Sequence, residues 1–154
     1  MRDQESPDSR MLTQAEADQL IQMQKRFVQS PASISIPPGT DDTYELAGPG
    51  DRERFQLDIW RGTLRLSKLK FQNRVRTAVV LVRLCVDGAP HTDPDGQRLS
   101  GTHLHLYKEG CDDRWARPVD PVKFTLLSDP GATFQEFCTF CSILAPPPVQ
   151  GVIV

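Results

Sequence analysis

The chain has 154 residues, of which 38% are hydrophobic and 25% charged, a composition typical of one globular domain. Its formal net charge of −2 excludes a protein that binds polyanions through bulk positive charge. No apolar run approaches the ~20 residues that cross a membrane, and the N-terminal MRDQESPDSR lacks the apolar segment of a secretory signal. The four cysteines stand mostly in apolar runs, as free thiols do in a reducing compartment. We therefore expect a cytoplasmic protein with no membrane partner.

The first regular element that the sequence predicts is a helix over residues 14–29. Thr13 and Glu16 match a capping box, in which each side chain accepts a hydrogen bond from a helix-end N–H group. Apolar residues at helical spacing follow, and Pro31 ends the pattern. Residues 30–53 are rich in proline and glycine and carry five acidic residues against one arginine. We expect an acidic loop there, with at most a short edge strand over residues 33–36.

Apolar residues alternate from residue 54 onward, which predicts β-strands. A first strand is followed by a tight turn at Arg61-Gly62 and by a return strand through Leu64 and Leu66, with a bulge near residue 67. Residues 75–86 (VRTAVVLVRLCV) predict a central strand that is apolar on both faces. After a turn-rich loop, the alternation of THLHLY predicts a further strand over residues 102–107.

A second helix is predicted to begin near Pro130, with Thr133 and Glu136 in its first turn. Its apolar stripe includes Cys138 and Cys141, so we interpret this Cys-x-x-Cys pair as core packing. The expected fold is α+β, with an antiparallel sheet of about four strands flanked by an N-terminal and a C-terminal helix. We expect one domain over residues 13–145, with flexible tails over residues 1–12 and 146–154.

The three histidines form the first candidate site, because all of them fall within residues 91–105. His103 and His105 share one side of the predicted strand, roughly 7 Å apart, and Tyr107 extends the same row. His91 lies on the preceding loop with Asp93 and Asp95, where a hairpin-like return would bring it near the row. Imidazole exchanges protons near neutral pH, so this row predicts acid–base catalysis, for example of RNA cleavage without a metal. The alternative is that the histidines line a solvated sheet face.

A metal site is the second chemistry that the same strand suggests. His103, His105 and Glu109 have a spacing that can bind a divalent metal, and this spacing resembles the first metal motif of the cupin barrels. The resemblance covers seven residues, and no later histidine supplies the fourth ligand of those barrels. We expect no cofactor, with a divalent metal at these three residues as the alternative.

A basic run forms the second candidate site. Six cations and no acid lie between residues 61 and 76: Arg61, Arg65, Lys68, Lys70, Arg74 and Arg76. Clusters of this kind bind nucleic-acid phosphates, and Phe71 within the run would offer a stacking face. The alternative is a solvated strand face that the acidic residues of 41–53 neutralise.

Several segments resemble a family of small uncharacterised bacterial proteins, some of them carried on mobile elements. They are Arg61–Arg76, Pro90–Gly96 (PHTDPDG) and Gly101–Gly110 (GTHLHLYKEG), followed by Trp115-Ala116. The likeness covers roughly residues 54–145, implies an autonomous prokaryotic domain and brings no established activity. The proline-rich segment over residues 30–53 is the part least expected to belong to it.

Three functional hypotheses follow from these patterns. The leading one is a metal-independent ribonuclease of the toxin type. In it, His103 and His105 are acid and base, His91 and Tyr107 are accessory, and the basic run binds RNA. The second is a non-catalytic phage or mobile-element protein that inhibits or binds a protein partner. The third is a metalloprotein.

Overall fold

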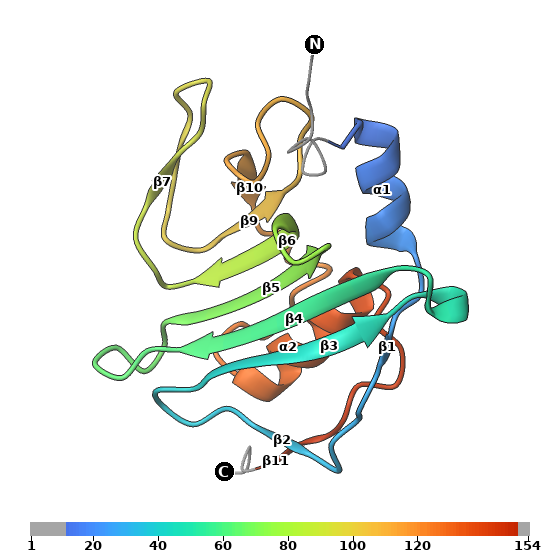
Figure 1. The fold of residues 1–154 in the computed structure, drawn as a ribbon. Coiled ribbons are helices and arrows are strands. Elements are labelled where there is room, and N and C mark those ends of the chain that lie inside the picture. Colours follow the sequence, from blue (N-terminus) through green and yellow to red (C-terminus); the bar gives the residue numbers. More distant parts are fainter. Residues whose placement is uncertain (1–11, 151–154) are drawn as a thin grey trace.

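The computed structural model describes residues 12–150 and has an α+β fold built on one large antiparallel sheet (Figure 1). The sheet has seven strands in the order β1-β3-β4-β5-β6-β9-β10. Their bounds are β1 Arg26–Phe27, β3 Asp41–Ala47, β4 Arg54–Arg61, β5 Leu69–Val75, β6 Val79–Val86, β9 His103–Leu106 and β10 Ala116–Pro118. The α+β class is as expected, but the expected count of about four strands is wrong.

Smaller elements complete the described part of the chain. The helices are α1 Gln14–Gln22 and α2 Pro130–Phe140, and a short 3-10 turn covers Pro49–Asp51. β2 (Ile34–Ser35) pairs in parallel with β11 (Val149–Gln150), and β7 (His91–Thr92) pairs with β8 (Arg98–Leu99) as a hairpin. None of the helices between residues 12 and 150 is long and apolar enough to span a bilayer.

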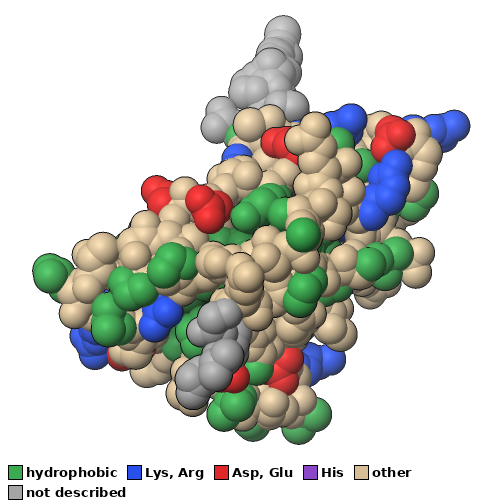
Figure 2. Space-filling view, turned by 90° about the horizontal axis from the view of Figure 1, so that it is seen from below, with side chains coloured by type: hydrophobic (Ala, Val, Ile, Leu, Met, Phe, Trp, Pro, Cys, Tyr) green, Lys and Arg blue, Asp and Glu red, His purple; other side chains and the backbone are tan. Residues whose placement is uncertain are grey.

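The two faces of the sheet differ in character because only one of them is covered by α2, which lies behind the sheet in Figure 1. Phe134 and Phe137 of α2 place their rings 5.7 Å from that of Phe71 on β5, and all three are fully buried. The opposite face carries a polar row across β4, β5 and β6, consisting of Asp58, Gln72 and Arg83. Seen from below, the side chains in view are hydrophobic, basic and acidic, and no histidine is visible among them (Figure 2).

The first helix has the expected capping box of Thr13 and Glu16, but it ends at Gln22 rather than near residue 29. Lys25 explains the early end. Its buried ammonium donates hydrogen bonds to the carbonyls of Ile21 and Met23 at 2.9 Å and of Cys141 at 2.7 Å. This cation satisfies carbonyls at the C-terminal ends of both helices, and the chain then enters β1 as an edge strand of the sheet.

The proline- and glycine-rich segment contains a long strand that composition did not predict. β3 pairs with β4 along all seven of its residues, and Gly39 (φ 86°) precedes it while Gly48 follows it. The expectation of an irregular loop over 30–53 is therefore wrong, because the prolines and glycines lie at the ends of the strand and not within it.

Two further strand predictions were wrong. The expected strand over residues 75–86 is divided by a turn in which Arg76 and Thr77 adopt positive φ angles of 54° and 70°. Residues 62–68 form a loop rather than a return strand, and the side chain of Leu64 is completely exposed.

The second helix begins at Pro130, as expected, and Asp129 is its N-cap residue. The Glu136 carboxylate accepts hydrogen bonds from Thr125. Cys138 and Cys141 are fully buried, as expected. Of the expected tails, residues 1–11 lie outside the described part of the chain, while Val149 and Gln150 belong to β11.

Substitution of Lys25 by methionine should change how stability depends on pH. Burial lowers the pKa of Lys25 to about 8, against 10.5 in an unfolded chain. Between these values the unfolded state binds more protons at Lys25, so raising the pH stabilises the folded wild type. We expect urea unfolding to show the wild type gaining about 2 kcal/mol relative to Lys25→Met between pH 7 and 9.5. A difference in unfolding free energy between the two proteins that stays constant from pH 7 to 9.5 would contradict this account.

Candidate metal centre

The pairing of β6 with β9 brings together the side chains of the candidate site. Cys85 lies opposite His103 and Arg83 lies opposite His105, on the sheet face that α2 does not cover. Because alternate residues of a strand point to one side, this register places a thiol, a guanidinium and two imidazoles side by side. Tyr107 continues the row beyond the last residue of β9.

The third histidine reaches this cluster on the β7–β8 hairpin, which stands above the sheet edge in Figure 1. The ring centroid of His91 lies 4.7 Å from that of His105 and 5.4 Å from that of His103, and the latter two rings are 4.8 Å apart. The hairpin neck is narrow, since the Gly88 amide donates to the Gly101 carbonyl at 2.9 Å. A Cβ at Gly101 would lie 2.0 Å from the Gly88 oxygen, so only glycine fits at position 101.

Backbone carbonyls fix the proton on each imidazole ring. His103 Nδ1 lies 2.7 Å from the Ser100 oxygen and His105 Nδ1 lies 2.8 Å from the Asp113 oxygen. A carbonyl oxygen can only accept, so both Nδ1 atoms carry hydrogen and both Nε2 atoms keep a free lone pair. His91 is reversed, because its Nε2 donates to the Arg114 carbonyl and to Asp93 Oδ1, each at 2.9 Å.

Three of these side chains converge closely enough to share a metal ion. One ligand atom each from Cys85, His103 and His105 lies within 4.8 Å of the others. A tetrahedral zinc ion holds nitrogen and sulfur ligands roughly 3.3–3.6 Å apart, given its usual bond lengths. Modest side-chain rotations would therefore bring the trio onto one ion. No other such group of histidine, cysteine and acidic side chains occurs between residues 12 and 150.

Burial keeps the ligand atoms in the trio uncharged. His103 and His105 are each 3% exposed. Burial, with the nearby Arg83 guanidinium, lowers the pKa of His105 to about 4, and burial also lowers the pKa of His103. Both rings are therefore neutral at pH 7. Burial raises the pKa of the Cys85 thiol, against the opposing effect of the positive charges on Arg83, Lys70 and Lys68.

Asp93 completes the cluster as a buried carboxylate with an incomplete set of partners. Its Oδ1 accepts hydrogen bonds from the Ala116 amide at 2.8 Å and from His91. Its Oδ2 is buried and has no hydrogen-bond partner among the described residues. A buried carboxylate in this condition is costly unless a cation lies nearby. Asp95 lies on the same loop, but its carboxylate accepts a hydrogen bond from the Gln97 amide within the turn.

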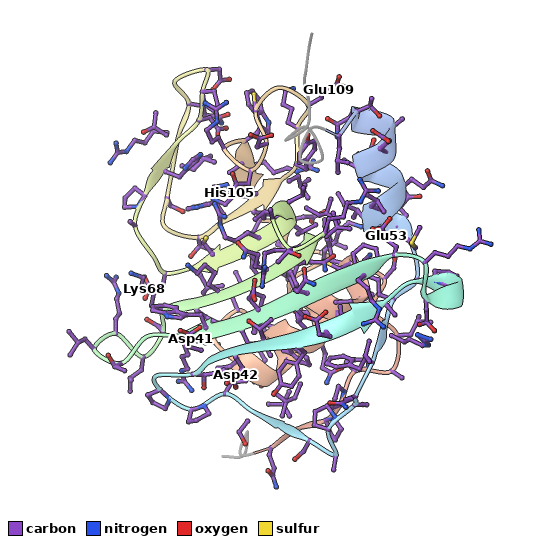
Figure 3. All side chains as sticks on the ribbon, in the orientation of Figure 1. Asp41, Asp42, Glu53, Lys68, His105 and Glu109 are labelled. Carbon is purple, nitrogen blue, oxygen red and sulfur yellow. The ribbon has the colours of Figure 1, made fainter. Side chains whose placement is uncertain are left out.

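Two residues expected at the site contact the first helix instead. The Tyr107 hydroxyl donates to the Leu12 carbonyl and accepts from the Leu12 amide, both at 2.9 Å. The Glu109 carboxylate accepts from the Gln14 amide at 2.9 Å. Figure 3 shows Glu109 near the start of α1, well away from His105. The structure therefore brings Cys85, and not Glu109, to the two histidines, and both Tyr107 and Glu109 anchor α1.

Most cations of the basic run are engaged within the fold. Arg65 pairs with Asp87, Arg74 with Asp58 and Arg76 with Glu53, at 2.9, 2.7 and 3.1 Å. Arg61 donates to the carbonyls of Ile36 and Leu66. Lys68 and Lys70 lie beside Trp60, with their ammonium groups 5.6 and 5.5 Å from its ring centroid. Phe71, the expected stacking face, is fully buried against α2.

Comparison with known proteins gives a family match without a known activity. The model of a family of unknown function, DUF6978, matches residues 12–143. The chain belongs to the DUF6978 family. This confirms the resemblance to an uncharacterised family, and the match also includes residues 30–53, which were not expected to belong. None of the curated proteins and none of the solved structures matches this DUF6978 chain.

A matched pair of glycine substitutions tests whether the hairpin neck positions His91 and Asp93 in this DUF6978 protein. Gly101→Ala would force the neck open, since its Cβ meets the Gly88 backbone. The Ala116 amide donates a hydrogen bond to Asp93, and we expect its hydrogen exchange to become at least about tenfold faster in this variant. Gly88→Ala is the control, because a Cβ on the other side of the neck would lie 3.7 Å from its nearest neighbours, the Gly101 oxygen and Lys68 Cε, in ordinary van der Waals contact. If the Ala116 amide exchanged at the same rate in Gly101→Ala and in the wild type, the neck would not be needed to position Asp93.

Proposed function

We propose that this protein binds one transition-metal ion through Cys85 Sγ, His103 Nε2 and His105 Nε2, and that Zn²⁺ is the ion best suited to these ligands. The observation that carries the proposal is that one ligand atom from each of these three side chains lies within 4.8 Å of the other two. Thiolate and imidazole together are typical ligands of zinc in proteins, whereas magnesium and calcium prefer oxygen.

The surroundings of the trio support this proposal because they resemble the outer shell of known metal sites. A metal-binding histidine commonly donates its second ring N–H to a carbonyl or a carboxylate, which fixes the ring. His103 and His105 donate to carbonyls in this way. His91 donates to Asp93 and to the Arg114 carbonyl, so it is the candidate for the fourth ligand. The ion would also compensate the buried charge of Asp93.

The burial of the site favours a structural role for the ion over catalysis by free imidazoles. RNA cleavage would require a substrate hydroxyl to reach His103 and His105, but each of these residues is only 3% exposed. The ion would instead connect β6 and β9 with the β7–β8 hairpin. The ribonuclease hypothesis remains a prediction from the sequence that this burial does not favour, and the protein-inhibitor hypothesis remains a prediction on which the site has no bearing.

Cobalt titration of the purified, metal-free protein tests the proposal. Tetrahedral Co²⁺ with a thiolate ligand gives a sulfur-to-metal charge-transfer band and intense visible bands. We expect both bands at one equivalent, displacement by one equivalent of Zn²⁺, and loss of the charge-transfer band in Cys85→Ser. Cys111→Ser is the matched control, since this thiol is half-buried too and lies outside the trio.

The same titration tests whether Glu109, a ligand in the hypothesis from the sequence, takes part in metal binding. Glu109→Gln should leave the cobalt spectrum unchanged, because Glu109 contacts Gln14. If the wild type gives no charge-transfer band, or if Cys85→Ser keeps it, the proposed ligand set is wrong.

Substitution of Asp93 by asparagine should weaken metal binding without removing a ligand of the trio. The side chain keeps its shape but loses the charge that supports His91, and outer-shell changes of this kind cost about 10- to 100-fold in affinity. Competition with a chromophoric chelator would measure the dissociation constant for Zn²⁺. An affinity equal to that of the wild type would exclude Asp93 and His91 from the site.

A further inference from the structure

The sheet face next to the metal centre carries a second feature, formed by Trp60, Lys68 and Lys70 and here named the Trp60 patch. Trp60 on β4 lies directly opposite Lys70 on β5, and Lys70 lies opposite Cys85 on β6. Lys68 comes from the end of the 62–68 loop, which lies where β4 ends and β5 begins (Figure 3). Loop and register thus place two ammonium groups beside one half-buried indole ring.

The two lysines differ from the arginines of the same run in their partners. Arg65, Arg74 and Arg76 each form an ion pair within the fold. Between residues 12 and 150, no carboxylate oxygen lies within 4.0 Å of either lysine ammonium. The positive charge of Lys68 and Lys70 is therefore available to a ligand, in a protein whose net charge is −2.

A hollow of about 470 Å³ adjoins the ring. Its lining includes Trp60, Thr63, Lys68 and Pro90, so it lies between the 62–68 loop and the base of the β7–β8 hairpin. This volume is within the range of ordinary small-ligand sites. On the other side of Trp60, the neighbouring strand β3 places the acidic Asp41 opposite it, so the positively charged surface does not extend beyond β4 there.

We infer that the Trp60 patch binds single-stranded nucleic acid. A base would take the place of the two ammonium groups beside the indole ring and stack on it, while Lys68 and Lys70 turn to contact the flanking phosphates. Aromatic rings and unpaired cations are the two elements of sequence-tolerant single-strand binding sites. Lysine acts as a flexible point charge, which suits a backbone that passes along an open surface. The inference is independent of the metal proposal, since none of the three residues belongs to the ligand set.

Fluorescence anisotropy with a labelled oligothymidylate tests the inference, using wild type and variants that each hold one equivalent of Zn²⁺ so that the metal content is the same throughout. In the Lys68→Gln/Lys70→Gln variant we expect the affinity to fall at least about tenfold. The slope of log affinity against log salt should fall by about 1.4, because each single-strand phosphate contact contributes roughly 0.7. Trp60→Leu should weaken binding by roughly 5- to 150-fold, as expected for the loss of one stacked base.

Lys108→Gln is the matched control, because Lys108 lies 4.4 Å from the ring centroid of Trp115, the other tryptophan. It should bind the oligonucleotide as the wild type does. A logarithmic loss in Lys108→Gln of half that in the double variant or more, as one charge against two requires, would show only general charge attraction and would overturn the inference. Wild-type affinity in the double variant would overturn it too, as would a free nucleoside monophosphate that competes as strongly as the oligonucleotide. Circular dichroism spectra establish that each variant is folded.

Discussion

The register between β6 and β9 is the constraint on which the candidate site depends. It sets Cys85 against His103 and Arg83 against His105, and it sends all four side chains to the face that α2 leaves uncovered. A shift of one residue would turn His103 and His105 into the apolar layer beneath α2 and expose Leu104. The burial of Leu104 beside Leu84 therefore holds the histidines in place, so the core and the site are maintained by the same pairing.

A short stretch of backbone orients the rest of the cluster. The Asp113 carbonyl accepts from His105, the Arg114 carbonyl accepts from His91, and the Ala116 amide donates to Asp93. Ala116 itself is held opposite His105 by the pairing of β10 with β9. The carboxylate of Asp113 also pairs with Arg83 at 2.8 Å. Residues 113–116 thus hold two histidines and an aspartate through main-chain groups, which sequence patterns do not reveal, and an arginine through the Asp113 side chain.

The sequence predicted those features that depend on local periodicity. The parity of His103 and His105, the capping box at Thr13 and the buried stripe with Cys138 and Cys141 all follow from the spacing of neighbouring residues. Contacts between residues far apart in the sequence determine the features that were predicted wrongly. β3 exists because β4 pairs with it, and α1 ends early because Lys25 reaches the end of α2.

The absence of Cys85 from the predicted site has a specific cause. Its strand was interpreted as apolar on both faces, although Arg83 two residues earlier marks that side as polar. The parity of Arg83 and Cys85 was the available signal. Glu109 was misplaced because β9 ends at Leu106 and the chain then turns towards α1.

The hairpin closed by the neck at Gly88 and Gly101 lies between two of the proposed metal ligands, and a metal link between them would also constrain the unfolded chain. Cys85 and His103 are 18 positions apart (103 − 85), and the whole hairpin lies between them. An ion that joined them would act as a reversible cross-link around this loop. By the loop-closure estimate for covalent bridges, a link of this size removes about 3 kcal/mol of conformational entropy from the denatured ensemble. A small domain with four free thiols would then gain the rigidity of a disulfide bridge without oxidation.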